Sequence, residues 1–186
     1  IVVMYPYLLE LYEDKDKWYI SDTEFLQILN LLESYVFRRF ICDVPTNALN
    51  KIFMLLWKEI KSFPDYEDKY FDIFKYLLLN KVWPQRFPND NEFQNYLLTK
   101  DIYNTQSKNK LHLLERLESN NSKESYVWIL IEEWELSIEH IMPQTLTPDW
   151  EKELWEKNRE IHSKYLHTLW NITLTWYNSK YSNKPF

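Results

Sequence analysis

Glycine is absent from this 186-residue sequence, and that absence is its most unusual feature. At an average usage of about 7%, a chain of this length would carry roughly 13 glycines. Glycine is the usual residue where the backbone turns with a positive φ angle, so the turns here must be made by other residues. The absence also excludes a glycine-rich phosphate-binding loop of the kind that cradles nucleotides.

Cysteine and long apolar stretches are scarce as well. The single cysteine, Cys42, excludes an internal disulfide framework and a multi-cysteine zinc site, and it fits a reducing, cytoplasmic setting. No run of about 18 uninterrupted apolar residues occurs, so we expect no membrane-spanning helix and no membrane partner. The start lacks the basic leader and cleavage site of a signal peptide. Because the first residue is Ile, we expect an internal piece of a longer protein.

The overall charge is acidic and the apolar content is high. The formal net charge is −6, which excludes strong non-specific nucleic-acid binding through bulk positive charge. A nucleic-acid role would therefore rest on a local site, a metal ion or a missing part of the protein. Hydrophobic residues make up 45% and aromatic residues 18% of the chain, which excludes wholesale disorder and allows an extensive core.

Residues 1–125 are predicted to form a helical domain, because apolar side chains recur there at helix spacing. The stripes are Phe25, Ile28, Leu29, Leu32 and Val36; Leu49, Ile52, Phe53, Leu56 and Ile60; Tyr70, Phe71, Phe74, Leu77 and Leu78; Phe93, Tyr96 and Leu97; and Leu111, Leu114 and Leu117. Ser21 starts a capping-box string, Thr46 or Asn47 can cap the next helix, and Asp90 can cap a later one. The polar run at 119–125 predicts a linker.

Residues 126–186 have a mixed texture that predicts a small α+β domain. Short β-prone stretches occur at 126–131, 136–141 and 171–175, and a helix is expected within 149–166. The predicted fold class is therefore mainly α, with a helical domain at 1–125 followed by a small α+β domain at 126–186.

The Glu139–His140 pair is the most informative chemical feature, because it places a carboxylate beside an imidazole at the end of a predicted strand. Histidine is the natural general base near neutral pH, and a carboxylate is a hard oxygen ligand suited to Mg²⁺ or Mn²⁺. A turn at the strand end would let both side chains converge. An ordinary surface pair is the alternative interpretation.

Three asparagines follow near the end of the chain, at Asn171, Asn178 and Asn183. An asparagine amide can orient an imidazole or offer a carbonyl oxygen to a metal ion. Asparagine is also common in turns and caps, which is the alternative interpretation.

Together these strings resemble the C-terminal nuclease domain of the GmrSD type IV restriction endonucleases. The matching pieces are residues 138–144, Trp150, 167–169, Asn171, 173–175, 177–179, 182–183 and 185–186. The string at 38–51 resembles the helical region that precedes the nuclease in the same proteins.

The resemblance implies an HNH-like, or His-Me finger, nuclease with a ββα unit that grips one divalent cation, Mg²⁺ or Mn²⁺. In that arrangement His140 is the general base for the attacking water and Asn171 holds the loop that carries it. Glu139 and Asn178 are the expected metal ligands, with Asn183 as the less favoured choice. The implied reaction is metal-assisted hydrolysis of DNA phosphodiesters.

The resemblance also implies partners. The family acts in modification-dependent phage defence, so the expected substrate is modified phage DNA. Its ParB-like nucleotide-binding domain has no counterpart here, so we expect that domain, and any nucleotide dependence, to lie before residue 1. The family string continues beyond Phe186, so the last helix is expected to be truncated. We therefore expect this piece to cleave DNA poorly alone.

Basic side chains that could contact phosphates are Arg38, Arg39, Lys51, Lys180 and Lys184. For the arginine pair, bridges to acidic neighbours are the alternative. A separate candidate is the pair His162 and His167, but five positions place them on different helix faces, so a shared metal ion is not expected.

Tryptophan is in excess, with nine residues, while glycine is absent. Trp170 and Trp176 stand where the family string has glycine, and glycine would also suit the positions of Trp18 and Trp155. One hypothesis explains both anomalies: some tryptophans occupy glycine positions, as would follow from reading one codon under the wrong genetic code. If instead they are native, bulky rings flank Asn171 and the site is expected to be remodelled.

The sequence thus predicts a fragment of a DNA endonuclease from a phage-defence restriction system. A non-catalytic helical interaction module with a degenerate HNH fold is the alternative, and an RNA-directed nuclease with the same site remains open.

Overall fold

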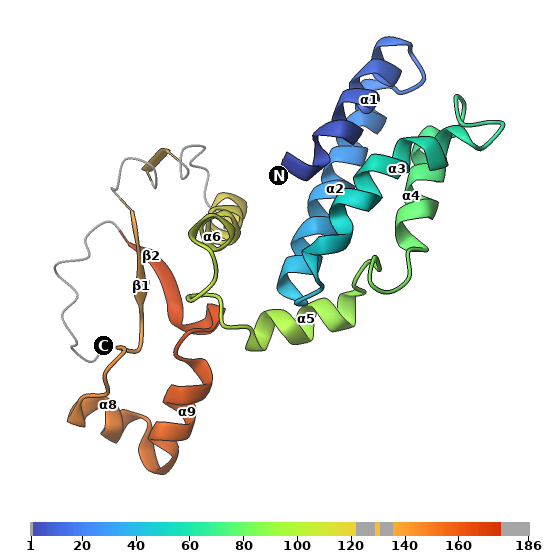
Figure 1. Ribbon diagram of the computed structural model, residues 1–186. Coiled ribbons are helices and arrows are strands. Elements are labelled where there is room, and N and C mark those ends of the chain that lie inside the picture. Colours follow the sequence, from blue (N-terminus) through green and yellow to red (C-terminus); the bar gives the residue numbers. More distant parts are fainter. Residues whose placement is uncertain (1, 122–128, 131–135, 176–186) are drawn as a thin grey trace. The chain divides into compact units, whose positions relative to one another are not determined.

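The computed structural model describes residues 2–121, 129–130 and 136–175 (Figure 1). The chain divides into two compact units, Ile1–Gln94 and Asn95–Phe186. The predicted domain boundary at 125 lies outside the described residues, as do four of the six residues of the strand predicted over 126–131. The other two, Ile129 and Leu130, are helical, so the strand prediction is wrong there. The linker predicted from residue 119 is wrong for its first three residues, because helix α6 (Ser107–Asn121) continues through them.

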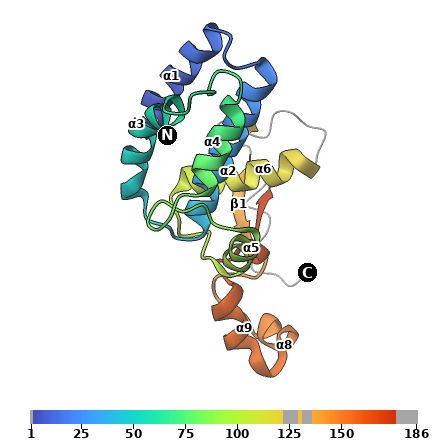
Figure 2. The same cartoon turned by 90° about the vertical axis from the view of Figure 1, so that its right-hand side faces the viewer.

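The first unit is a bundle of helices (Figure 2). Its buried apolar side chains form one core cluster. Its helices are α1 (Tyr5–Asp16), α2 (Asp22–Ile41), α3 (Leu49–Lys61) and α4 (Tyr70–Leu79), with 3₁₀ turns η1 (Val2–Met4) and η2 (Thr46–Ala48). The fully buried core residues are Tyr7, Leu11, Ile28, Leu32, Tyr35, Phe53, Leu56, Ile60, Phe74 and Leu78. Most of them belong to the predicted apolar stripes, so the prediction of helices in this region is confirmed.

The helix starts follow the sequence only in part. The capping box before α2 is confirmed, because Ser21 Oγ accepts the Glu24 N–H at 3.2 Å while the Glu24 carboxylate accepts the Ser21 N–H at 3.0 Å. The cap predicted at Thr46 or Asn47 is wrong. Those residues form the turn η2, which leads directly into α3 without a side-chain cap.

Helix α5 (Asp90–Thr99) is capped by the residue before the predicted one. Asn89 Oδ1 accepts the backbone N–H of Glu92 at 2.9 Å, so Asn89 is the capping residue rather than Asp90. Asn and Asp are similarly good caps, which explains why the sequence alone did not separate two neighbours.

A buried ion pair ties α1 to α3. The Asp14 side chain is fully buried, and its carboxylate lies 2.8 Å from Lys61 Nζ. A buried carboxylate needs such a partner, because desolvation of an isolated charge is costly.

Two of the suspect tryptophans occupy the left-handed backbone region. The φ angle is 66° at Trp18 and 60° at Trp155, and their side chains are 92% and 80% exposed. At the end of α1 the Trp18 N–H donates to Lys15 O, and the Tyr19 N–H donates to Asp14 O. These two bonds form the helix-ending motif in which glycine is the preferred residue, at the position of Trp18. The backbone expected for glycine is confirmed at both tryptophans.

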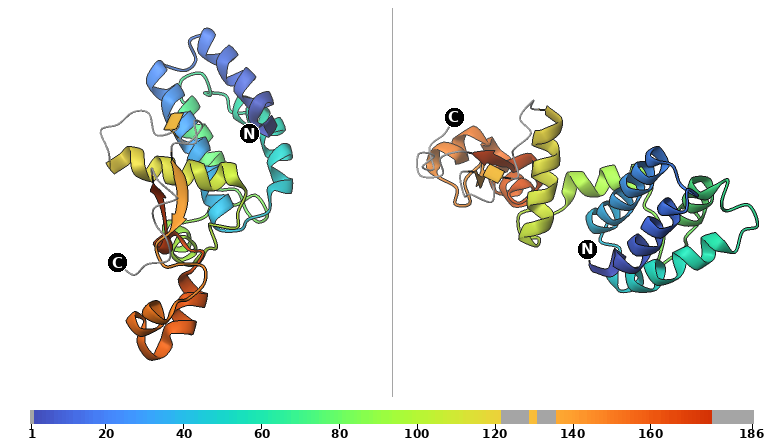
Figure 3. Two further views of the ribbon diagram at one scale, coloured as in Figure 1. Left: turned by 90° about the vertical axis from the view of Figure 1, so that its left-hand side faces the viewer. Right: turned by 90° about the horizontal axis from the view of Figure 1, so that it is seen from above.

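The second unit is built around a two-stranded antiparallel sheet (Figure 3). Strand β1 (Ser137–His140) pairs with β2 (Ile172–Thr175), with Glu139 opposite Thr173 and His140 opposite Ile172. Between them lie α8 (Pro148–Glu153), η3 (Trp155–Lys157), α9 (Asn158–Tyr165) and η4 (Leu169–Asn171). Both strands were expected from the sequence.

The helix expected within 149–166 is interrupted, because the backbone turns at Trp155 between α8 and α9. Within the described ranges, every helix is too short or too polar to span a lipid bilayer. The end of α5 and all of α6 belong to the second unit, and α6 lies beside the strands in Figure 3.

Candidate active site

The loop that follows β1 is held in place by Asn171. The backbone N–H of Met142 donates to Asn171 Oδ1 at 2.6 Å, and Asn171 Nδ2 donates to Met142 O at 3.0 Å and to Leu166 O at 2.9 Å. The Ile141 N–H also donates to Asn171 O at 2.9 Å. This set of bonds fixes the chain immediately after His140, because it engages the next two residues.

The Asn171 amide has no alternative orientation in this clamp. A backbone N–H can only donate, so the amide oxygen must face Met142 N, and the amide nitrogen then faces two carbonyls. Asn171 is only 5% exposed, so its two bonds to Met142 are sheltered from water. A sheltered polar group that lost its partner would be costly, so the clamp is a rigid support.

His140 lies at the end of β1 in a cluster of rings. Its ring centroid is 4.2 Å from that of Tyr103 and 5.4 Å from that of His167, and the Tyr103 and His167 rings stack at 5.5 Å. His140 Nε2 lies 3.3 Å from His167 Nδ1, and His140 Nδ1 lies 3.4 Å from Gln144 Nε2. Both ring nitrogens therefore have polar partners.

Burial lowers the pKa of the His140 imidazole below its usual value, and the neighbouring His167 lowers it further, while Asp101 acts in the opposite direction. A lowered pKa favours the neutral ring, which keeps a lone pair that can accept a proton near neutral pH. The site therefore suits a general base.

The predicted metal ligands are not gathered by the described residues. Strand β1 continues through His140, so alternation along the strand directs Glu139 and His140 to opposite faces of the sheet. The other two predicted ligands, Asn178 and Asn183, lie outside the described residues. Within the described ranges no three His, Cys, Asp or Glu side chains form a metal-binding group. The described residues alone therefore do not make a metal centre.

His162 and His167, the pair considered above for a shared metal ion, contact different groups. His162 Nε2 lies 2.9 Å from Pro143 O, where it supports the loop after His140. His167 instead faces His140.

Three basic side chains of the first unit were predicted to contact phosphate, and the buried one is bound to protein carbonyls instead. The Arg39 guanidinium is buried and donates to the carbonyls of Pro84, Arg86 and Pro45 at 3.0, 3.2 and 2.5 Å. Arg39 is therefore a structural residue, and the prediction of a DNA contact there is wrong.

The neighbouring candidates differ in their surroundings. Arg38 Nη1 lies 2.5 Å from Asp90 Oδ1, which is the acidic bridge weighed as the alternative. Lys51 is exposed on α3. Lys180 and Lys184 lie outside the described residues.

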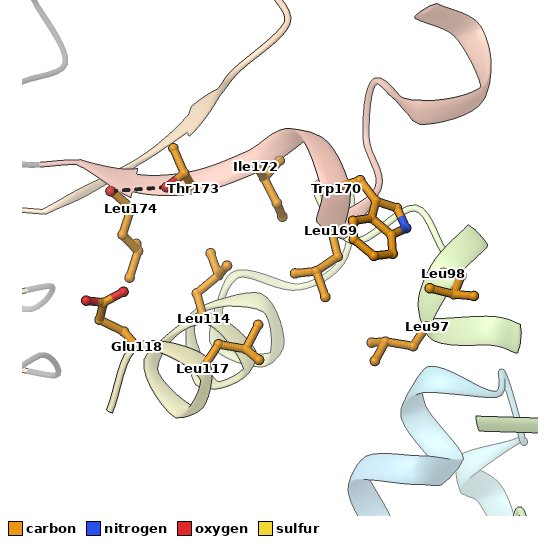
Figure 4. A pocket seen from close by; sticks show the side chains of 10 residues that line it. All are labelled: Leu97, Leu98, Leu114, Leu117, Glu118, Leu169, Trp170, Ile172, Thr173 and Leu174. Atoms are coloured by element: carbon orange, nitrogen blue, oxygen red, sulfur yellow. Dashed lines mark hydrogen bonds between the residues drawn. The ribbon is translucent and has the colours of Figure 1, made fainter. Parts of the chain in front are cut away.

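An apolar cavity of about 350 Å³ lies between α6 and β2 (Figure 4). Leucines of α5, α6, η4 and β2 line it, together with Trp170, and Glu118 is its one charged side chain. His140 and Asn171 are not among its lining residues. A leucine-lined cavity with one carboxylate does not suit an anionic phosphate, so the cavity is distinct from the candidate active site.

Trp170 does not disrupt the clamp beside it. Its side chain is 62% exposed, and among the described residues positive φ angles occur at Trp18, Asp43 and Trp155 but not at Trp170. The backbone at Trp170 therefore does not adopt the positive φ that glycine would allow there. Trp176 lies outside the described residues.

Tyr103 and His167 are the functional candidates that sequence reasoning missed. Each meets His140 only through the fold, since His167 is 27 positions away and Tyr103 lies before α6. The one available signal was the position of His167 in the same short string as Asn171.

Comparison with known proteins identifies the family. No curated protein and no solved structure matches this chain. The model of a protein family described as GmrSD restriction endonucleases, C-terminal domain, matches residues 87–186, which is more than half of the chain and includes His140 and Asn171. The match implies a nuclease domain of the restriction-endonuclease type, with DNA as the substrate. The chain therefore belongs to the GmrSD restriction endonuclease family, as a carrier of its C-terminal domain.

Proposed function

We propose that this chain supplies the catalytic histidine of a DNA endonuclease that acts in modification-dependent phage defence. The observation that carries the proposal is the clamp of Asn171 on the loop directly after His140. A general base has to be held at a fixed position, and the clamp holds the backbone directly after His140 from a buried amide. The lowered pKa of His140 supports the same role.

In the proposed reaction His140 takes a proton from the attacking water. The water oxygen forms a bond to phosphorus, and the bond from phosphorus to the leaving deoxyribose oxygen breaks. Positioned general bases contribute about 10²–10⁴-fold to such rates. Asn171 acts through His140, because it keeps the loop and the ring in place.

The proposed ligands of one divalent cation, Mg²⁺ or Mn²⁺, are Glu139 and Asn178, with Asn183 as the less favoured alternative. A bound cation of this kind stabilises charge on the phosphate and the leaving oxygen. A convergence of Glu139 with His140 would require the end of β1 to turn away from regular pairing, and the ββα, HNH-like arrangement is part of this proposal. The nucleotide-binding domain of the same system, ParB-like in the family, is proposed to reside elsewhere in the parent protein.

A non-catalytic interaction module with a degenerate HNH fold is the second candidate. It is favoured by the placement of Glu139 and His140 on opposite faces of the sheet, because a degenerate site need not gather its ligands.

Nicking of supercoiled plasmid DNA by the protein that carries this chain separates the two candidates. We expect activity with Mg²⁺ or Mn²⁺, loss of activity with a chelator, and a fall of about 10²–10⁴-fold in His140→Ala. His162→Gln is the matched control, because glutamine keeps a donor for Pro143 O, and it should retain activity. Equal activity of His140→Ala and the unmodified protein would contradict the proposal and favour the interaction module.

A further inference from the structure

Beyond His140 and its clamp, the contacts within the ring cluster indicate which nitrogen of the His140 ring carries the proton. The amide nitrogen of Gln144 can only donate, and it lies 3.4 Å from His140 Nδ1. With the amide in this orientation, the neutral ring accepts at Nδ1 and carries its proton on Nε2. That Nε2–H then faces His167 Nδ1, 3.3 Å away, which accepts it in the tautomer of His167 that carries its proton on Nε2.

His167 is itself fixed by contacts outside the strand and loop. Its backbone carbonyl accepts the N–H groups of Ile102 and Tyr103 at 2.9 and 3.1 Å. Its ring stacks on Tyr103 at 5.5 Å with an interplanar angle of 14°. The ring of His167 is therefore held from the segment between α5 and α6, in addition to the bond from Asn171 Nδ2 to the neighbouring Leu166 O.

Tyr103 is held in turn by Lys110, whose ammonium donates to Tyr103 O at 2.6 Å and lies 4.6 Å from the centre of its ring. The Tyr103 ring also packs on His140 at 4.2 Å. The acceptor that faces His140 Nε2 thus belongs to a cluster with fixed geometry.

We propose that His167 is a positioning residue that holds His140 as the Nε2–H tautomer and so leaves the Nδ1 lone pair free to take the proton of the attacking water. The proposal rests on the proposed function, since it assigns the atom of His140 that acts as the base. A base oriented by a third group through its other nitrogen is a recurring arrangement in hydrolases.

The proposal also assigns a place to the reacting water. Gln144 is exposed, and its amide occupies the position in front of His140 Nδ1. Because the contact is long at 3.4 Å and the side chain is at the surface, Gln144 can leave when the water and the phosphate arrive. The other nitrogen of the ring stays directed at His167.

The tautomer can be measured directly on the 186-residue chain by long-range ¹H–¹⁵N NMR of its four histidines, at a pH where the rings are neutral. We expect His140 to be the Nε2–H tautomer in the unmodified chain. In His167→Phe the stacking on Tyr103 is kept but the acceptor is lost, so the Nδ1–H form should become populated. In His167→Asn the amide oxygen replaces the acceptor, and the Nε2–H form should persist.

His162→Gln is the control, and it should leave the tautomer of His140 unchanged because His162 contacts Pro143 O rather than the ring. The proposal is overturned if His140 carries its proton on Nδ1 in the unmodified chain, or if His167→Phe has the same tautomer population as that chain. This NMR result does not depend on cleavage, so it can fail while the nuclease assignment stands.

The kinetic counterpart uses the protein that carries this chain. His167→Phe should lower kcat about tenfold or more, by less than the 10²–10⁴-fold of His140→Ala, with KM for DNA unchanged. His167→Asn should restore most of kcat. Unchanged kcat in His167→Phe, in a protein where His140→Ala is inactive, overturns the positioning role and leaves the proposed function intact.

Discussion

The two compact units of the chain are stabilised by different kinds of contact. In the first unit, four helices enclose fully buried apolar side chains, so burial of hydrophobic surface is the main source of stability. In the second unit the sheet has two strands of four residues each, and a buried amide and a ring cluster position the loop after His140. In this molecule, therefore, the large apolar core belongs to one unit, and the contacts that set the geometry of the candidate site belong to the other.

The largest expected effect on stability breaks the first unit. Phe53 is fully buried in α3 and packs edge-on against Tyr35 with ring centroids 6.5 Å apart. Phe53→Ala should lower the free energy of unfolding by about 3–5 kcal/mol, because it removes buried surface and leaves a cavity. Met54 is 59% exposed on the same helix, so Met54→Ala should change it by less than about 0.5 kcal/mol. Urea unfolding measures both, and equal effects would show that α3 does not face the core as described.

A second substitution breaks the polar support of the second unit. Asn171→Ala leaves the buried N–H of Met142 without its partner, together with two carbonyls. A buried backbone group left unpaired costs about 1–3 kcal/mol. We expect a loss in that range and a loosening of the loop after His140, seen as faster amide hydrogen exchange at Ile141 and Met142.

The matched control for that clamp is Asn158, whose amide donates to Glu151 O at 3.3 Å at the surface. Asn158→Ala should change the unfolding free energy by about 0.5 kcal/mol. Protection of Ile141 and Met142 that is unchanged in Asn171→Ala would remove the basis for the clamp.

The parts of the fold that the sequence predicted are those set by neighbours along the chain. The start of α2 was predictable because Ser21 and Glu24 cap each other three residues apart. The apolar stripe of α3 was predictable because its period matches the helix. The start of α3 was not, because η2 takes over the role of a side-chain cap at Thr46.

The candidate site was predictable only where its residues lie in a recognisable string. His140 and Asn171 were expected from that string. The structure adds the bond by which Asn171 holds Met142, two residues after His140. Tyr103 and His167 were not expected beside His140, because long-range contacts between rings leave no periodic pattern in the sequence. Arg39 was assigned to DNA because charge was counted without burial, and its carbonyl partners in Pro84 and Arg86 come from a distant segment.

A pH titration sharpens the contrast between the units. Burial raises the pKa of Tyr35 to about 12, and its hydroxyl donates to Gln85 O at 2.6 Å. Above pH 10 the unfolded chain releases this proton while the folded chain keeps it, so stability falls as the pH rises from about 10 to 12. The loss is on the order of 1 kcal/mol per pH unit in that window. Tyr35→Phe should make the fall shallower, as measured by unfolding at several pH values.

Buried Tyr7 and Tyr70, whose pKa values burial also raises, contribute to the same fall, so the variant should reduce the slope without abolishing it. A slope that Tyr35→Phe leaves unchanged would argue against a buried, neutral Tyr35 in the first unit.

The smallest expected effect concerns the tryptophans with positive φ, one in each unit. A left-handed backbone costs a non-glycine residue about 1–2 kcal/mol, while glycine loses about 0.5–1 kcal/mol more backbone entropy on folding. Trp18→Gly and Trp155→Gly should therefore each stabilise the chain by about 0.5–1 kcal/mol, because their exposed rings add little packing. Thermal melting measures the difference.

Trp57 in the middle of α3 is the control for these variants, because it packs against the core of the first unit. Trp57→Gly should destabilise the chain. Destabilisation by all three substitutions alike would contradict the hypothesis that Trp18 and Trp155 occupy glycine positions.

The most direct test of the account combines two readouts on one variant, His140→Ala in the protein that carries this chain. We predict that its plasmid-nicking rate falls by about 10²–10⁴-fold while its melting temperature stays within a few degrees of the unmodified protein. A nicking rate that is unchanged in the folded variant would contradict the assignment of His140 as the general base. It would also contradict the assignment of the chemistry to the second unit.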